Sequence, residues 1–284
     1  VQFGIEAGQE AGIAETAVLR CRFARCAKAA VSIQGFNSLD WYLWQCLFED
    51  CGLGVTNEFG AGNFHVYRSV FLRSTEADVS TKHTGYFTLY GNVSIGSKAF
   101  YLGKRHPMWQ ADETHPANVT LQDNRIIRPA DAACVRVGNN GPIFLLDNQV
   151  LSAAGAEGPV VVHDCPGEGD LVAVGNTFTV ADAIKASGRL VEIDNAVADV
   201  TAPDAPPALP GPPHSLGRPV VEVDAGADAA AIQVAIDKAA AMKGRRPVVH
   251  LPAASYRVDR TLVIPAGADL QLVGDGIIQA TVLN

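Results

Sequence analysis

The chain has 284 residues, of which 48% are hydrophobic and 18% charged, and its net charge is −8. This composition indicates a globular protein with a sizeable core, in one large domain or two smaller ones. The negative charge argues against a nucleic-acid or anionic-membrane partner, and no apolar run approaches the roughly 18 residues of a membrane span. The chain begins with a strand-like run and no signal peptide, so we expect that an N-terminal part of a longer protein is missing.

A repeat begins near the N-terminus. The stretches "TAVLRCRFARC" (16–26) and "WYLWQCLFEDC" (41–51) share a frame with cysteines at the sixth and eleventh positions, and the runs 63–74 and 86–97 continue it. One position of the frame holds Cys46, Ser69 and Asn92, spaced 23 residues apart. A fixed period of this size is typical of a solenoid.

The same position then continues as asparagines, each after a short apolar run and an Asp or Gly: Asn124, Asn148, Asn176 and Asn195. Each period holds three β-type runs, and no helical periodicity occurs between residues 16 and 200. We therefore predict an all-β fold, a right-handed parallel β-helix over residues 1–200. Its inward corner asparagines are expected to bond to the next coil.

The repeat predicts that Cys21 stacks on Cys46 at one corner and Cys26 on Cys51 at the next. Small, readily buried reduced thiols suit such inward corners. A disulfide between stacked coils stays open as an alternative. A zinc site is less favoured, because four residues separate the two cysteines of each pair, on a strand repeat.

Residues 201–219 contain seven prolines and are predicted to form a linker. The run 228–243 is the one convincing helix pattern, with Asp228 as the N-cap and an apolar face of Ile232, Ala235, Ile236 and Ala239. Short strands with Pro and Gly turns follow it.

The segment 220–276 carries a helix, then "LPAASY" and "LVIPAGADLQLVGDG", and resembles the opening of pectate-lyase-superfamily β-helix domains, with Ala254 in place of a glycine. The resemblance implies that 220–284 begins a second β-helix, in a layout similar to two-domain exo-β-1,3-glucanases. It also implies a secreted or cell-surface protein that cleaves an extracellular polysaccharide, by hydrolysis in preference to elimination. The motifs of pectate lyases and polygalacturonases are absent. The alternative is a non-catalytic structural or glycan-binding solenoid, similar to a tailspike shaft or an adhesin module.

In enzymes of this fold the substrate usually lies along one sheet. Alternation along the strands predicts an outward column of Gln34, Glu58 and Lys82, with His83 at its end. The same alternation places Asp78 outward. Gln34 is a candidate for substrate binding.

Two chemistries fit this column. Glu58 is a candidate general acid, with Asp78 or Asp40 as the second carboxylate of a glycoside hydrolase. Lys82 or His83 is a candidate base for proton abstraction beside a uronate. The plainer interpretation is a surface ion pair between Glu58 and Lys82.

A second outward column holds Trp44, Tyr67 and Tyr90, beside Tyr42, His65 and Thr88. These aromatic residues are candidates for stacking on sugar rings. The favoured alternative is an interface with a second β-helix domain or another subunit, because these strands are apolar on both faces. In that case His65 is a packed residue.

No cofactor is predicted. Acidic residues at the neighbouring corners 48–51 and 73–78 suggest calcium as a weaker alternative, without the D-x-D-x-D spacing of a calcium loop. The basic loop 103–109 either reaches toward the substrate or, as we favour, is simply solvated.

Overall fold

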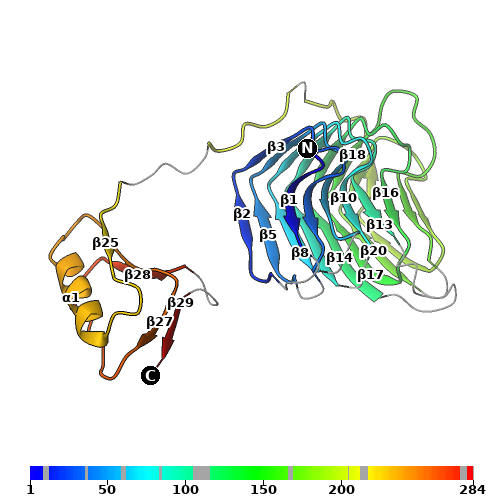
Figure 1. The fold of residues 1–284 in the computed structure, drawn as a ribbon. Coiled ribbons are helices and arrows are strands. Elements are labelled where there is room, and N and C mark those ends of the chain that lie inside the picture. Colours follow the sequence, from blue (N-terminus) through cyan, green and yellow to red (C-terminus); the bar gives the residue numbers. More distant parts are fainter. Residues whose placement is uncertain are drawn as a thin grey trace. The chain divides into compact units, whose positions relative to one another are not determined.

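A computed structural model describes residues 1–8, 13–35, 38–58, 62–82, 85–104, 116–165, 169–203, 205–211, 217–275 and 280–283. The chain divides into two compact units, Val1–Pro212 and Pro213–Asn284. The first unit is a parallel β-solenoid with three sheets (Figure 1), called the solenoid below. The prediction of an all-β parallel solenoid is therefore confirmed.

Each sheet of the solenoid holds eight parallel strands, and every coil contributes one strand to each sheet. The first sheet contains β1 (Phe3–Ala7), β4 (Ala29–Ile33), β7 (Leu53–Thr56), β10 (Ala77–Thr81), β13 (Tyr101–Gly103), β16 (Val135–Val137), β19 (Val161–His163) and β22 (Ile184–Ala186). The second contains β2 (Ala17–Leu19), β5 (Trp41–Trp44), β8 (Phe64–Tyr67), β11 (Tyr86–Tyr90), β14 (Pro116–Gln122), β17 (Gly141–Leu146), β20 (Asp170–Val174) and β23 (Arg189–Ile193). The third contains β3 (Arg22–Ala24), β6 (Leu47–Glu49), β9 (Val70–Leu72), β12 (Val93–Ile95), β15 (Arg125–Ile127), β18 (Gln149–Leu151), β21 (Thr177–Phe178) and β24 (Ala196–Val197).

The corner between the second and third sheets is built as the repeat predicts. A residue with left-handed backbone, such as Asp123 with φ of 52°, turns the chain, and the next residue points inward. The backbone N–H of Cys46 donates to Oγ of Ser69 at 3.1 Å, and that of Ser69 donates to Oδ1 of Asn92 at 2.9 Å. From Asn92 to Asn176 every corner asparagine donates through Nδ2 to the asparagine of the next coil, which ends the ladder at Asn195. The predicted ladder is confirmed.

The core lies between the three sheets. Inward side chains of like kind stack coil on coil, as in the third sheet, where the rings of Phe23 and Phe48 lie 5.3 Å apart and those of Phe48 and Phe71 4.6 Å apart. Burying each such ring stabilises the fold by roughly 2–3 kcal/mol. Register between coils is therefore set by packing inside and by the corner hydrogen bonds.

The second unit begins with β25 (Val220–Glu222) and continues through α1 (Ala229–Ala240), β26 (Val248–Leu251), β27 (Ala254–Arg257), β28 (Gln271–Gly274) and β29 (Ala280–Leu283). Strands β25, β26 and β28 form one parallel sheet, and β27 pairs with β29. The helix is shorter than the predicted 228–243, because the chain leaves helical geometry after its C-cap at Ala241.

The sequence correctly places the start and the packed side of α1. Asp228 accepts a hydrogen bond from the backbone N–H of Ala231 at 2.9 Å, which satisfies one of the free amides at the helix start. The predicted apolar face, from Ile232 to Ala239, is buried against β25 and β26.

Candidate functional site

A polar row runs over the outer side of the first sheet, at and just beyond the ends of its early strands. We define the polar row as Glu6, Gln34, Glu58, Lys82 and Lys104, all partly or fully exposed. Nε2 of Gln34 donates to Oε1 of Glu6 at 2.8 Å, and Lys104 Nζ lies 2.6 Å from Glu58 Oε1. Oγ of Ser80 also donates to Glu58. Gln34, Glu58, Lys82 and Lys104 thus share one column along the solenoid axis, and Glu6 reaches Gln34 from two residues earlier on its strand.

The structure bears on two of the expectations for this row. Glu58, Gln34 and Lys82 lie along it as predicted, but among the described residues Glu58 pairs with Lys104 rather than with Lys82. The backbone N–H of Lys82 donates to Oδ1 of Asn57 at 2.9 Å, which fixes the backbone at this position. His83 lies outside the described residues.

Asp78 is not on the outer surface, so its predicted outward orientation is wrong. Its side chain is fully buried in the core, and neither carboxyl oxygen has a hydrogen-bond partner. The hydroxyls of Ser74, Ser94 and Ser97 surround it without reaching hydrogen-bond geometry. Burial raises the pKa of Asp78 to about 7, and these hydroxyls oppose the rise. Asp78 therefore belongs to the core and is inaccessible to a polymeric substrate.

Strand alternation breaks down at this point of the first sheet. Ala30 and Val31 are adjacent in β4, and both lie in the core. By register Asp78 stacks on Gly54, where an added Cβ would strike the ring of Phe71. In the coil of Asp78 the third sheet carries Ser94 in place of that ring, which leaves room for the carboxyl group.

An aromatic row covers the outer side of the second sheet. We define the aromatic row as Tyr42, Trp44, His65, Tyr67 and Tyr90. Register pairs Trp44 with Tyr67 and Tyr67 with Tyr90, as the repeat predicts. The ring centroids of Tyr42 and His65 lie 5.1 Å apart and those of Trp44 and Tyr67 4.9 Å apart, with small to moderate tilts.

Tyr42 and Trp44 turn their ring faces toward His65 and Tyr67 of the next coil, whereas Tyr67 and Tyr90 meet edge to face, at 68°. A sugar stacks on the face of an aromatic ring, so stacking between neighbouring coils leaves mainly ring edges for a ligand. Nδ1 of His65 is buried without a hydrogen-bond partner. Burial lowers the pKa of His65, with Asp40 opposing the effect, so the imidazole stays neutral at neutral pH. This geometry suits an uncharged contact surface better than a sugar-stacking platform.

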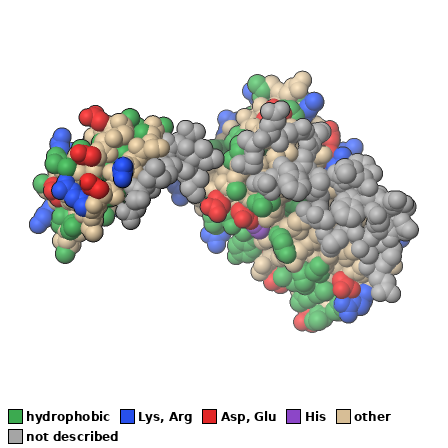
Figure 2. Space-filling model, turned by 60° about the horizontal axis from the view of Figure 1, so that its bottom comes forward, with side chains coloured by type: hydrophobic (Ala, Val, Ile, Leu, Met, Phe, Trp, Pro, Cys, Tyr) green, Lys and Arg blue, Asp and Glu red, His purple; other side chains and the backbone are tan. Residues whose placement is uncertain are grey.

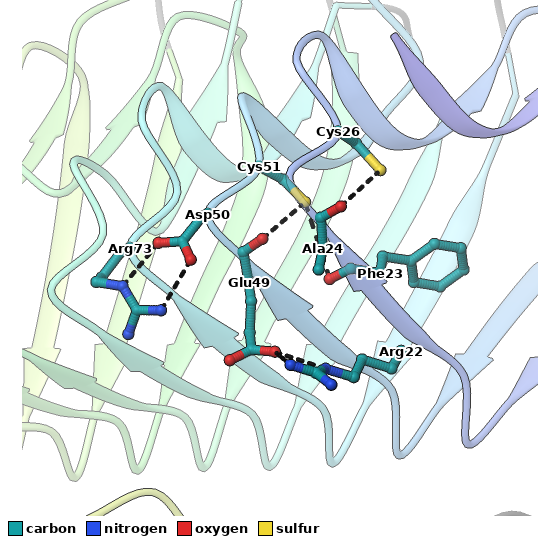
Figure 3. Close-up of polar contacts among 8 residues, drawn as sticks. All are labelled: Arg22, Phe23, Ala24, Cys26, Glu49, Asp50, Cys51 and Arg73. Atoms are coloured by element: carbon teal, nitrogen blue, oxygen red, sulfur yellow. Dashed lines mark hydrogen bonds and ion pairs between the residues drawn. The ribbon is translucent and has the colours of Figure 1, made fainter. Parts of the chain in front are cut away.

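The cysteine corners hold stacked thiols (Figure 3). Sγ of Cys51 lies 3.3 Å from the carbonyl oxygen of Glu49, and Sγ of Cys26 lies 4.0 Å from that of Ala24. All six cysteines are free, and among the stacked pairs only Cys21 is exposed. Burial raises the pKa of Cys51 to about 11, which keeps it a thiol at neutral pH.

The acidic residues of this corner are paired with arginines. Asp50 accepts two hydrogen bonds from Arg73, at 2.7 and 3.0 Å, and these bonds lower the pKa of Asp50 (Figure 3). Glu49 pairs with Arg22 at 2.6 Å. In the part of the chain that the structure describes, no group of three or more His, Cys, Asp or Glu side chains comes together as a metal site would require.

The cavities do not point to another site. A cavity of about 250 Å³ opens at the last coil between β21, β22 and β24, with Asp182 and Glu192 among its lining residues. It is the unfilled end of the core stack rather than a pocket over either row. Over the described residues, no helix is long and apolar enough to cross a bilayer.

Two members of the polar row were not identified from the sequence. Lys104 lies in the basic loop that we expected to be solvated, and Glu6 precedes the first recognised repeat. Glu6 pairs by register with Ser32, two residues before Gln34, and joins the row through the hydrogen bond that its side chain accepts from Gln34. Lys104 follows β13, whose register places it directly above Lys82.

Comparison with known proteins adds no further assignment. No family model matches the chain, and neither a curated protein nor a solved structure matches it. The resemblance of 220–276 to pectate-lyase-superfamily domains therefore stays a prediction, and the function rests on the geometry of the solenoid.

Proposed function

We propose that the solenoid binds one extended, uncharged polysaccharide chain along the polar row. The observation that carries the proposal is the row itself, with one polar side chain per coil and four of the five in one column. Stacked coils rise by about 4.8 Å, which is close to the length of one sugar unit in an extended glycan. A regular polymer can therefore make the same contact again at each coil.

Charge supports a neutral ligand. The polar row contains two carboxylates and two ammonium groups, so its own charges balance, while the whole chain carries −8. Long-range repulsion would disfavour a polyuronate. Gln34 and the paired Glu58 and Lys104 offer both donors and acceptors to sugar hydroxyls. The proposal implies a secreted or cell-surface location, where such polymers occur.

Hydrolysis is the second candidate. Asp78 is excluded as the second carboxylate by its place in the core, but Glu6 lies on the row two coils before Glu58. Two strand spacings amount to about 10 Å, and Glu6 also lies two residues along the strand from the Glu58 column, so both side chains would have to turn toward each other to reach the roughly 6.5–9.5 Å of an inverting glycosidase. Glu58 would act as the general acid and Glu6 as the base that activates water.

The test uses the full chain and a panel of neutral and acidic polysaccharides, in affinity electrophoresis and calorimetry. We expect binding to a neutral glycan, weakened about tenfold by Gln34→Ala and by Glu58→Gln, since each removes polar contacts along the chain. Lys185→Ala is the matched control, because Lys185 is exposed on the same sheet but lies beyond the row. Equal effects of all three variants, or no binding across the panel, would contradict the proposal.

Reducing-sugar and unsaturated-product assays on the same panel separate the two candidates. Reducing ends that disappear in both Glu58→Gln and Glu6→Gln indicate hydrolysis. Unsaturated products that disappear in Lys82→Ala indicate elimination instead. Binding without either product leaves a glycan-binding solenoid.

A further inference from the structure

Two outward positions on each strand of the second sheet carry no charged side chain, and the charged Asp170 and Arg189 lie to one side of them at the start of β20 and β23. Two outward side chains per coil, sixteen in all, form this face, which we call the apolar face. One column contains Leu19, Trp44, Tyr67, Tyr90, Gln122, Leu146, Val174 and Ile193. The other contains Ala17, Tyr42, His65, Thr88, Thr120, Phe144, Val172 and Val191. Figure 2 shows one side of the molecule, with hydrophobic side chains gathered in patches on the solenoid. Surfaces of this length without a charge mark interaction sites.

Large and small side chains are unevenly distributed along the apolar face. The aromatic row occupies the second to fourth coils, whereas the sixth to eighth coils carry mostly aliphatic residues. Trp44 is 42% exposed and Ile193 50% exposed, so both ends of the face are open to a partner. A complementary partner surface would carry small side chains opposite the aromatic residues and large side chains opposite the aliphatic ones.

Charges line one edge of the apolar face, at the left-handed corner residues after each strand. Arg20 and Arg68 mark the first and third coils, and Asp123, Asp147 and Asp194 mark the fifth, sixth and eighth. Among the described residues none of these five takes part in a salt bridge, unlike Arg73 and Asp50 at the next corner. This edge is therefore basic at one end and acidic at the other. Arg20 donates to Gln45 and Arg68 lies over the ring of Tyr90, and neither contact neutralises the charge.

A second copy of the same chain meets both requirements when it lies antiparallel. A two-fold axis parallel to the strands places the first coil opposite the eighth, the third opposite the sixth and the fourth opposite the fifth. Arg20 then faces Asp194 of the other copy, and Arg68 faces its Asp147. Large side chains face smaller ones, as Trp44 faces Val174 and Tyr67 faces Leu146.

The parallel alternative fits less well. With the two-fold axis along the solenoid, aromatic coils face aromatic coils and aliphatic coils face aliphatic ones. The large side chains would then hold the two faces apart at one end, and the smaller ones at the other end would not meet. Arg20 would face Glu15 and Asp194 would face Arg189, but Arg68 would face Asn63 and Asp147 would face Pro142, so two of the four charges would have no partner.

The opposite edge tolerates the antiparallel arrangement. Glu15 faces Arg189 there, which is favourable. Asp40 faces Asp170, but Asp170 already receives two hydrogen bonds from Arg189, and Asp40 accepts one from Asn63. These contacts reduce the repulsion between the two carboxylates.

We propose that the solenoid forms an isologous antiparallel homodimer through the apolar face, with Arg20–Asp194 and Arg68–Asp147 as intermolecular ion pairs. Each pair occurs twice because of the symmetry. The apolar face supplies the area buried, and the charged edge sets the direction and register. The polar row lies on a different sheet and stays accessible in the dimer.

The test is sedimentation equilibrium of the full chain over a wide concentration range at low salt. We expect a dimer with twice the chain mass. Arg68→Asp and Asp147→Arg should each raise its dissociation constant about tenfold or more, and the combined variant should restore it, because the reversed charges meet again across the two-fold axis. Only the antiparallel register predicts this rescue. Circular dichroism confirms that the variants fold.

A second pair of variants tests the apolar face itself. Trp44→Arg should raise the dissociation constant at least about tenfold, by placing a charge against Val174 of the partner. Val234→Arg is the control, since Val234 is an exposed apolar residue on α1 in the second unit. A monomeric wild type at every concentration, a combined charge variant that stays weakened, or equal effects of Trp44→Arg and Val234→Arg would overturn the proposal.

Discussion

Asn124 and Asn148 occupy the same corner of successive coils, and Nδ2 of Asn124 donates to Oδ1 of Asn148 at 2.9 Å. The same Nδ2 also donates to the carbonyl oxygen of Leu89 at 2.8 Å, and Oδ1 of Asn124 accepts from Asn92. One buried amide therefore connects three coils.

Asn124→Ala should destabilise the solenoid by about 3 kcal/mol or more, because buried donors and acceptors in two neighbouring coils lose their partners. Urea unfolding followed by circular dichroism measures the change. Gln149→Ala is the control, since Gln149 makes an exposed hydrogen bond with Arg125 at 3.0 Å. An equal, small effect of both changes would show that the ladder does not hold the corner.

Asp78 should make stability fall as the pH rises. Its pKa is raised to about 7 in the folded chain, from 3.8, so between these values the folded state keeps a proton that the unfolded state has lost. The loss is on the order of 4 kcal/mol between pH 4 and 7, and no further loss is expected above pH 7. Asp78→Asn should therefore be more stable than the wild type at pH 8, by about 2 kcal/mol or more, and nearly equal to it at pH 4. Unfolding midpoints at the two pH values check this, and a wild type with equal stability at both would contradict it.

Alkylation should distinguish the exposed Cys21 from the three buried thiols of the cysteine corners. Cys21 is exposed, whereas Cys26, Cys46 and Cys51 are buried, and burial raises the pKa of both Cys46 and Cys51. Iodoacetamide at pH 8 should therefore modify Cys21 in the folded chain. It should modify the other three cysteines only once the chain is unfolded, and no reductant should be needed for that reaction. Mass spectrometry of peptides gives the result. Thiols that react in the unfolded chain only after reduction would indicate a disulfide between coils.

His250 should make the second unit sensitive to pH. Nδ1 of His250 lies 2.6 Å from Glu222 and Nε2 lies 2.9 Å from Asp275, and these bonds raise the pKa of His250. The stabilisation that protonated His250 gains from these two bonds is complete below pH 6.5, the ordinary pKa of histidine. It is lost as the pH rises through the raised pKa of His250 in the folded chain. Hydrogen exchange of the backbone amides of α1 should therefore be faster at pH 8 than at pH 6, once the measured rates are corrected for the pH dependence of intrinsic exchange. His250→Gln should abolish this difference, and a difference that persists would assign it to another group.

The repeat made the solenoid predictable. Cys46, Ser69 and Asn92 recur at a fixed spacing because an inward corner accepts only small or amide side chains, so the period can be read from the residue types. Asp228 and the apolar face of α1 were predictable for a similar reason, since capping and burial act within a few residues.

The residues of the polar row were only partly predictable. Glu58, Gln34 and Lys82 follow from the alternation of a single strand, but Lys104 joins them through register between coils and Glu6 through its side-chain hydrogen bond with Gln34. Asp78 was misplaced because alternation is a property of a regular strand, and the first sheet departs from it where Ala30 and Val31 both enter the core.

By itself, the sequence determined the all-β solenoid, its corner asparagines and the capped helix, because these depend on local geometry repeated along the chain. Only the tertiary structure decided which carboxylate lies in the core, which lysine pairs with Glu58 and which charges beside the apolar face make no salt bridge among the described residues. Those outcomes depend on the space that neighbouring coils leave for one another, as Ser94 leaves for Asp78, and distance along the chain does not specify that space.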